Sequence, residues 1–192
     1  ADFDTEHGGF GGAPKFPPAS TIEFLLRRGT PRALDMVRRT LDAMAAGGMY
    51  DVVGGGFHRY AVDGRWMIPH FEKMLYDNAL LASAYLHAWV VTGQERDRHV
   101  VEQTLDYVLR ELRLPEGGLA SAQDADTDGV EGLTYAWTLA EWSSLELDPT
   151  LLQPFEHGRC VVRGTLDEAT RRRLLEPRAA RPQPHRDDKV IA

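Results

Sequence analysis

The sequence predicts a mainly α-helical fold in which helical hairpins form two layers and short β-hairpins lie in the connecting loops. Three observations support this prediction. Helix start signals recur along the 192 residues. Two neighbouring helical segments distribute their apolar residues in different ways. Segments rich in glycine and aromatic residues follow the predicted helix pairs, which is typical of irregular loops.

Two helices are predicted near the start of the chain. Capping-box spacing at residues 20–23 predicts a helix that runs to about Arg28. Thr30 followed by Pro31 begins a second helix, because proline is favoured at the first helical position, and Gly47 ends it. The capping-box pattern returns at residues 138–141 and 165–168.

A third helix is predicted over about residues 70–92 and a fourth over about residues 95–114. The third is apolar on both sides, which predicts an enclosed helix: Leu81, Ala84 and Ala88 on one side, Leu75, Ala79, Leu86 and Val90 on the other. The fourth has one apolar stripe opposite a charged face: Val101, Leu105, Val108, Leu109 and Leu112. An enclosed helix beside a one-sided one favours two concentric layers, and a four-helix bundle is the alternative.

Alternation and aromatic content predict two short hairpins, at residues 56–66 and 119–137. Such loops between helices are where functional residues are usually found.

Composition and charge exclude several classes of protein. Charged residues make up 27% of the chain and apolar residues 43%, as in globular proteins, and no run approaches the ~20 apolar residues of a membrane span. In residues 1–155, 23 acidic and 13 basic side chains give a net charge of −10, which argues against a nucleic-acid partner. The single Cys160 and the acidic, Gly-rich start predict a cytoplasmic protein.

Candidate chemistry concentrates in residues 54–78. On the predicted third helix, His70, Lys73 and Asp77 have the spacing i, i+3 and i+7, so they are expected on one side. The dipole at a helix N-terminus disfavours a protonated ring, which would keep His70 neutral as a general base requires. The alternative is a Lys73–Asp77 ion pair beside a His70 that only starts the helix.

Four segments resemble successive signatures of the spermatogenesis-associated, thioredoxin-like family. They are residues 2–17 (DFDTEHGGFGGAPKFP), 47–78, 114–137 (LPEGGLASAQDADTDGVEGLTYAW) and 181–192 (RPQPHRDDKVIA). The resemblance implies a thioredoxin-like module, then an α/α toroid of six helical hairpins similar to N-acylglucosamine 2-epimerases and six-hairpin glycosidases, then a smaller C-terminal part. We therefore expect residues 1–192 to be a partial toroid, without the thioredoxin-like module and the rest of the ring. No CxxC pair is present to support dithiol chemistry.

The resemblance leaves three functions open. A sugar isomerase or epimerase needs two acid/base groups and a cation for the developing oxyanion. A glycosidase needs a pair of carboxylates. A non-catalytic platform for a ligand or protein, attached to the thioredoxin-like module, is the third. The candidate catalytic residues are His58, His70, Asp77 and Asp124. The candidate substrate-binding residues are Arg59, Tyr60, Asp63, Trp66, Lys73, Asp126, Glu131 and His185.

No metal ion or other cofactor is predicted. Residues 124–129 (DADTDG) begin like an EF-hand loop, but the twelfth position is Tyr135 instead of a bidentate glutamate. We expect Asp124 and Asp126 to be partners of Arg59 or His70 instead. The expected partner is a small sugar-like molecule, with neither nucleic acid nor membrane. An open half-ring is also expected to self-associate or to expose a large apolar surface.

Overall fold

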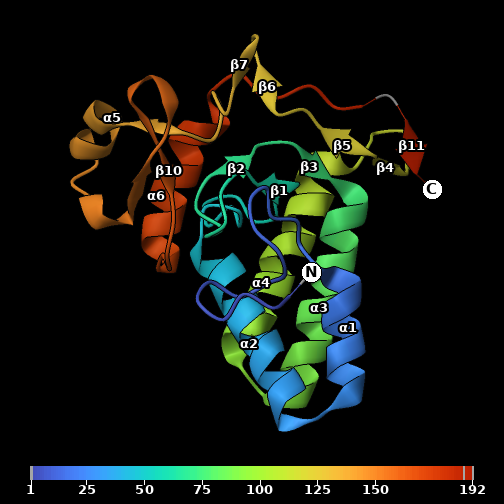
Figure 1. Cartoon of the computed structure of the whole chain (residues 1–192). Coiled ribbons are helices and arrows are strands. Elements are labelled where there is room, and N and C mark those ends of the chain that lie inside the picture. Colours follow the sequence, from blue (N-terminus) through green and yellow to red (C-terminus); the bar gives the residue numbers. More distant parts are fainter. Residues whose placement is uncertain (1, 188, 192) are drawn as a thin grey trace.

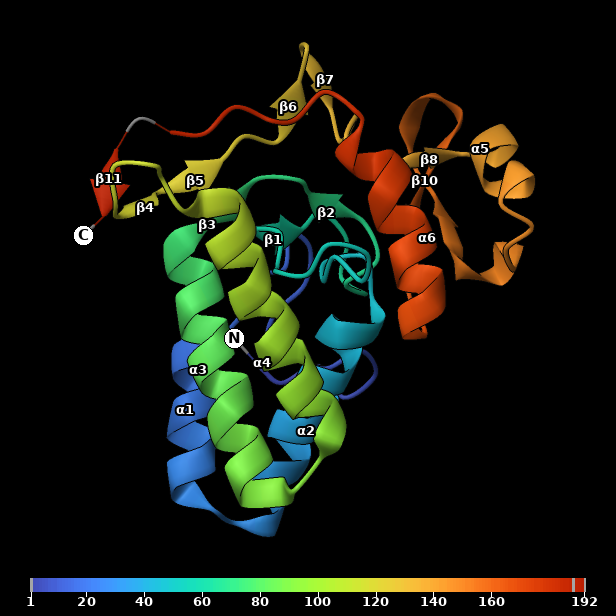
Figure 2. The ribbon, with the colours of Figure 1, turned by 180° about the vertical axis from the view of Figure 1, so that it is seen from behind.

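A computed structural model describes residues 2–187 and 189–191 of the chain. Its central part is built from four helices, α1 (Ala19–Arg28), α2 (Pro31–Ala46), α3 (Leu75–Thr92) and α4 (Glu95–Tyr107). α3 packs against both α4 and α1, and α1 packs against α2. α1 and α3 begin at the end where α2 and α4 finish, and the loops that follow α2 and α4 lie at that end, whereas the α1–α2 and α3–α4 turns lie at the opposite end (Figures 1 and 2).

The predicted limits of the first two helices are largely correct. Thr30 caps α2 by accepting a hydrogen bond from the Ala33 amide at 3.3 Å, with Pro31 at the first helical position. α1 begins one residue before Ser20 and has no side-chain cap, so the predicted capping box there is wrong.

α3 begins at Leu75, five residues later than predicted from the pattern. Two short strands precede it, β2 (Pro69–His70) and β3 (Lys73–Met74). β2 pairs with β1 (Tyr60–Ala61), and β3 pairs with β5 (Ala122–Gln123). The backbone groups before Leu75 therefore bond across to other segments, which prevents a helix there. His70 and Lys73 are not on α3, and the helix-dipole argument for His70 fails.

A π-helix (Val108–Leu112) follows α4 directly, over part of the range predicted as regular helix. Val101, Val108 and Leu112 of the predicted stripe are buried, but Leu105 and Leu109 are exposed. The prediction for the fourth helix is therefore correct for its position and only partly correct for its buried face.

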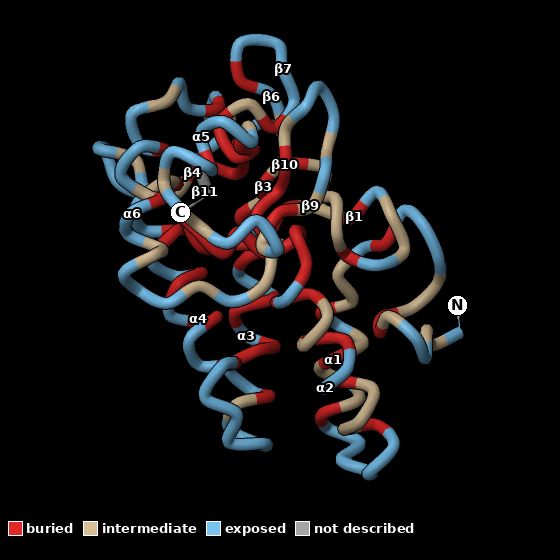
Figure 3. The backbone as a smooth tube through the Cα atoms, turned by 90° about the vertical axis from the view of Figure 1, so that its left-hand side faces the viewer, coloured by how far each residue is buried: buried red, intermediate tan, exposed pale blue. Residues whose placement is uncertain are grey.

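α3 is covered on one side only. Leu81, Ala84 and Ala88 are fully buried, whereas Leu86 and Val90 on the opposite side are 40% and 72% exposed. Figure 3 shows that exposed surface is common along the lower parts of the helices. Among the described residues, nothing encloses α3 as the sequence predicted.

Short strands and two further helices complete the fold. β4 (Leu119–Ala120) pairs with β11 (Val190–Ile191), and β6 (Asp126–Thr127) forms a hairpin with β7 (Val130–Glu131) that projects from the molecule in Figure 1. β8 (Trp137–Thr138), β10 (Arg159–Val162) and β9 (Leu152–Pro154) form a sheet in that order. α5 (Leu139–Ser144) and α6 (Glu168–Ala179) pack at this side, with 3₁₀ turns at Pro149–Leu151 and Glu156–Gly158.

The later sequence signals have mixed outcomes. The capping box at Thr138 is confirmed, whereas α6 is capped by Asp167 and not by Thr165. The first hairpin pairs Tyr60 with His70, so it lies later than the predicted residues 56–66. Of the predicted hairpin over residues 119–137, only β6 and β7 pair with each other among the described strands. β4, β5 and β8 pair instead with β11, β3 and β10.

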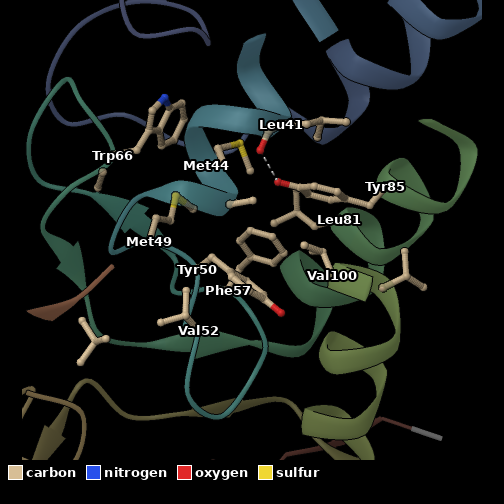
Figure 4. Close-up of a cluster of buried hydrophobic side chains, with 14 of the residues drawn as sticks. Leu41, Met44, Met49, Tyr50, Val52, Phe57, Trp66, Leu81, Tyr85 and Val100 are labelled. Carbon is tan, nitrogen blue, oxygen red and sulfur yellow. Dashed lines mark hydrogen bonds between the residues drawn. The ribbon is translucent and has the colours of Figure 1, made fainter. Parts of the chain in front are cut away.

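The main core lies between α2, α3 and the loop that follows α2. Phe57 from the loop stacks on Tyr85 of α3 with ring centres 5.4 Å apart. The Tyr85 hydroxyl donates to the carbonyl oxygen of Leu41 at 2.8 Å, so this buried polar group is satisfied (Figure 4). In the part of the chain that the structure describes, no helix has the length and apolar character needed to cross a bilayer.

Candidate acid–base site

A cluster of acidic, basic and aromatic side chains lies where the loops meet the start of α3. It consists of Arg59, Tyr60, His70, Glu72, Asp77 and Glu131, which we call the acid–base cluster. The β1–β2 pairing places Tyr60 opposite His70, and the Arg59 amide donates to the Glu72 carbonyl oxygen at 2.8 Å. Glu131 arrives from the β6–β7 hairpin, and Asp77 lies in the first turn of α3.

His70 is held between an aromatic ring and a carboxylate. Its ring stacks on Tyr60 with centres 4.9 Å apart, and its Nδ1 lies 2.7 Å from Oε1 of Glu131. An ionised carboxylate can only accept a hydrogen bond, so Nδ1 carries the proton in this pair. In the neutral ring Nε2 is then the unprotonated nitrogen, and it lies 3.9 Å from Oε2 of Glu72. His70 thus has the orientation of a general base fixed by a carboxylate.

Glu72 and Asp77 add two further carboxyl groups in different settings. Glu72 accepts a hydrogen bond from Nη1 of Arg59 at 2.6 Å. Partial burial raises the pKa of Asp77 to about 6, the charge of Arg59 opposes this rise, and the charge of Glu72 adds to it. Asp77 therefore exchanges protons closer to neutral pH than an ordinary aspartate. The cluster combines an oriented imidazole, an acid with a raised pKa and a guanidinium cation.

A second group of charges is buried beneath the loops, and it contains two of the predicted site residues. Asp51 accepts hydrogen bonds from Nζ of Lys73 at 2.8 Å and from Nη1 of Arg178 at 2.7 Å. Burial favours the neutral acid, but Arg178 and Lys73 outweigh it and hold the Asp51 pKa well below its usual range. Burial lowers the pKa of Lys73 to about 8. Lys73 is fully buried and pairs with Asp51, which corrects both its expected role in contacting substrate and the alternative Lys73–Asp77 pair.

His58 is a core residue, which corrects its expected catalytic role. It is 2% exposed, and its ring packs edge-on against Phe71 and Tyr135. Its Nδ1 lies 2.9 Å from the carbonyl oxygen of Phe71 and, as the only possible donor of the two, carries the proton. Burial and the charge of Lys73 lower the pKa of His58 to about 3. His58 and His70 therefore do not face one cavity as a pair of bases.

Trp66 and Asp63, which were predicted to bind substrate, stabilise the fold instead. Trp66 is fully buried and donates its indole N–H to the His7 carbonyl oxygen at 3.1 Å, so its ring cannot stack on a sugar. The Asp63 carboxylate accepts hydrogen bonds from the amides of residues 65, 67 and 68, which fixes the turn between β1 and β2.

Asp124, Asp126 and His185 are exposed and lie outside the acid–base cluster. The Asp124 amide donates to the His185 carbonyl oxygen at 2.9 Å, and Asp126 pairs with Glu131 across the β6–β7 hairpin. Glu72 and Glu131 occupy the places beside Arg59 and His70 that were expected for these aspartates. Among the described residues, no group of three or more His, Cys, Asp or Glu side chains could hold a metal ion.

The structure thus brings together Arg59, Tyr60, His70, Asp77 and Glu131 of the predicted site. Glu72 was not predicted, although alternation along residues 70–72 would have placed its side chain on the same face as His70. Asp51 and Arg178 were also missed. Asp51 and Arg178 are 127 positions apart in the sequence, and no local sequence pattern predicts a contact over that distance.

No protein-family model matches the chain. The chain is 41% identical to spermatogenesis-associated protein 20 of Homo sapiens and to that of Mus musculus, over 84% of its own length. It is 38% identical to an uncharacterized protein of Caenorhabditis elegans over 76% of its length. The chain spans 22% of the length of each of these relatives.

Two solved structures have a similar fold. One is a sugar epimerase from a ruminal bacterium, with a TM-score of 0.57 and 16% identity over 64% of this chain and 35% of that one. The other is cellobiose 2-epimerase from Spirochaeta thermophila, with a TM-score of 0.56 and 23% identity over 64% of this chain and 34% of that one. At these identities the likeness concerns the fold alone. The resemblance to the spermatogenesis-associated proteins is therefore supported over most of this chain, and its fold resembles part of a sugar epimerase.

Proposed function

We propose that this chain is part of an α/α toroid that binds a sugar-like ligand and transfers a proton next to a carbonyl group, as a sugar isomerase or epimerase does. The fold likeness to sugar epimerases supports the architecture. The observation that carries the chemistry is the 2.7 Å contact between Nδ1 of His70 and Glu131, which leaves Nε2 as a base.

Each group in the acid–base cluster has a defined part in this proposal. Nε2 of His70 takes the proton from the carbon beside the carbonyl, and Glu131 stabilises the imidazolium that forms. Arg59 supplies positive charge for the carbonyl oxygen as it becomes negative. Asp77, with its pKa of about 6, is the acid that returns a proton to carbon, and solvent restores both groups. Tyr60 holds the His70 ring by stacking.

The test is proton exchange in deuterated water with a panel of aldoses and ketoses, using the whole protein. His70→Gln is expected to abolish exchange while changing stability by no more than about 1 kcal/mol, because His70 is not a core residue. His87→Gln is the matched control, since Nδ1 of His87 lies 2.7 Å from Glu23 in the same type of pair outside the cluster. Exchange that survives in His70→Gln, or that is absent for every sugar in the folded wild type, would contradict the proposal.

A glycosidase-like reaction is the second candidate, and one observation favours it. The carboxyl group of Asp77 has a raised pKa and feels the charge of Glu72, and glycosidases pair a carboxylic acid with a second carboxylate. Hydrolysis of nitrophenyl glycosides that is lost in Asp77→Asn would select this reaction. Sugar binding without either reaction would leave the binding platform as the function.

A further inference from the structure

A cavity of about 160 Å³ lies between the π-helix after α4, strand β5 and helix α6. Residues that matter for its chemistry are Lys73, Tyr107, Arg110, Glu111, Gln123 and Arg178. The cavity is smaller than the ~300–1,000 Å³ of sites for drug-sized ligands, so it fits a small group. It is separate from the acid–base cluster, and none of the groups assigned to proton transfer lines it.

The charges around this cavity do not balance. Lys73, Arg110 and Arg178 are positive, while Glu111 and the buried Asp51 behind Lys73 and Arg178 are negative, which leaves one excess positive charge. Lys73 and Arg178 are 0% and 7% exposed, so two cations share the single buried carboxylate of Asp51. The rings of Tyr107 and Tyr135 lie 4.3 and 4.9 Å from Nζ of Lys73 and compensate only in part. Because an uncompensated buried charge is costly, this arrangement favours a bound anion.

The π-helix and Gly54 bring charged side chains close together at the cavity wall. The π-helix presents Arg110 and Glu111 to the cavity in succession, and such π-turns are frequent at functional sites. Nε of Arg110 donates to Glu111 at 2.7 Å and its Nη2 donates to the Gly54 carbonyl oxygen at 2.6 Å. A Cβ atom at position 54 would overlap the Arg178 guanidinium, so only glycine allows Arg178 to lie here.

Hydrogen-bond donors lie at the cavity wall. Gln123 is 2% exposed, and its Oε1 accepts the Tyr107 hydroxyl proton at 2.8 Å. Its amide group and the Arg110 guanidinium both lie at the cavity wall, and Arg110 is also exposed to solvent. An oxyanion in the cavity would accept charged or amide hydrogen bonds from both groups in place of solvent.

We propose that this cavity binds a small, singly charged oxyanion, either a carboxylate or a monobasic phosphate, through Arg110, Arg178 and Gln123. The bound anion completes the charge balance of the buried Lys73–Asp51–Arg178 group. The site needs no proton transfer at His70, so it stands whether or not the reaction proposed above occurs.

The test is a titration of the whole protein with acetate, inorganic phosphate and neutral acetamide, followed by the NMR signal of the Gln123 side-chain amide. Saturable binding of acetate or phosphate but not acetamide is expected, and the stronger of the two identifies the anion class. Arg110→Gln is expected to weaken binding about tenfold or more, because it removes a charged hydrogen bond. Arg113→Gln, which alters an exposed arginine near the π-helix, is the matched control and is expected to bind normally.

Three results would overturn the proposal. They are binding of acetamide as strong as that of acetate, equal anion binding by the wild type and Arg110→Gln, and no shift of the Gln123 amide with either anion. Arg110 is partly exposed, so its substitution is not expected to unfold the protein. A thermal melt of each variant confirms this before titration.

Discussion

His58 and His70 belong to the same short segment of sequence, yet their surroundings differ completely. Both were predicted as catalytic residues, His70 from its position at the start of the predicted third helix and His58 as a further imidazole in residues 54–78. The structure buries His58 between Phe71 and Tyr135, whereas His70 stays partly exposed beside Glu131. The sequence therefore predicted which residues gather near the site, but burial decides which of them can exchange protons, and burial depends on contacts such as Tyr135 that come from distant segments.

The pKa of His58 predicts how stability changes with pH. Its folded-state value of about 3 lies below the ordinary value of 6.5, so the native state requires the neutral ring. The contribution of the neutral His58 ring to the free energy of unfolding is fully present above pH 6.5. It is lost as the pH falls toward 3, by up to about 1.4 kcal/mol per pH unit. His58→Asn keeps a donor for Phe71 without titrating there, and it is expected to flatten this slope in urea unfolding between pH 6.5 and 4. His157→Gln, at an exposed histidine, is the control, and an unchanged slope in His58→Asn would refute the assignment.

Among the helices, two predicted start signals had different outcomes. The capping-box spacing at Ser20 and the Thr30–Pro31 pair were each predicted to begin a helix, and only Thr30 caps one with its side chain. Because α1 begins at Ala19, Ser20 lies inside the first turn. Its hydroxyl is therefore not in the N-cap position, from which it could accept a hydrogen bond from a free amide of that turn. The start of α3 was also predicted wrongly from local pattern, because the strand pairing of Lys73 with Gln123 prevents a helix before Leu75. Local patterns thus located the helices well, and long-range pairing set the boundaries that matter for the site.

This difference can be measured with two matched variants. Thr30→Ala removes the hydrogen bond to the Ala33 amide and is expected to destabilise the protein by about 1 kcal/mol. Ser20→Ala removes no cap and is expected to change stability by less than about 0.5 kcal/mol. Urea unfolding followed by circular dichroism gives both values. A loss in Ser20→Ala as large as that in Thr30→Ala would show that Ser20 caps α1 after all.

At the scale of the whole molecule, apolar side chains remain uncovered on the helices. The composition of α3 predicted burial on every side, but Leu80, Leu86 and Val90 are exposed, as are Leu105 and Leu109 near the end of α4. The sequence correctly showed that this surface is apolar. It could not show that the described residues leave this surface uncovered, because covering depends on contacts between distant segments.

We expect this surface to drive self-association of residues 1–192. Leu86 and Val90 lie four residues apart on α3 and therefore share one helix face, and exposed apolar side chains that lie together favour association. Sedimentation velocity over a range of concentrations is expected to show association, and the double variant Leu86→Lys with Val90→Lys is expected to reduce it, because it places two charges on one helix face. Val62→Lys changes an exposed valine in a loop and serves as the control. A wild-type chain that stays monomeric at every concentration would contradict this expectation.

The pairing of Arg178 with Asp51 also bears on the order in which the chain folds during synthesis. Asp51 and Lys73 emerge from the ribosome before Arg178, which lies on α6 and follows 127 residues after Asp51. Until α6 is made, Lys73 is the one cation among the described residues that pairs with Asp51, and the space beside Gly54 that receives the guanidinium is open to water. The loops at the top of the helices therefore reach their final packing only when α6 docks, so a nascent chain that is released before residue 178 would keep its helices but leave these loops loosely held.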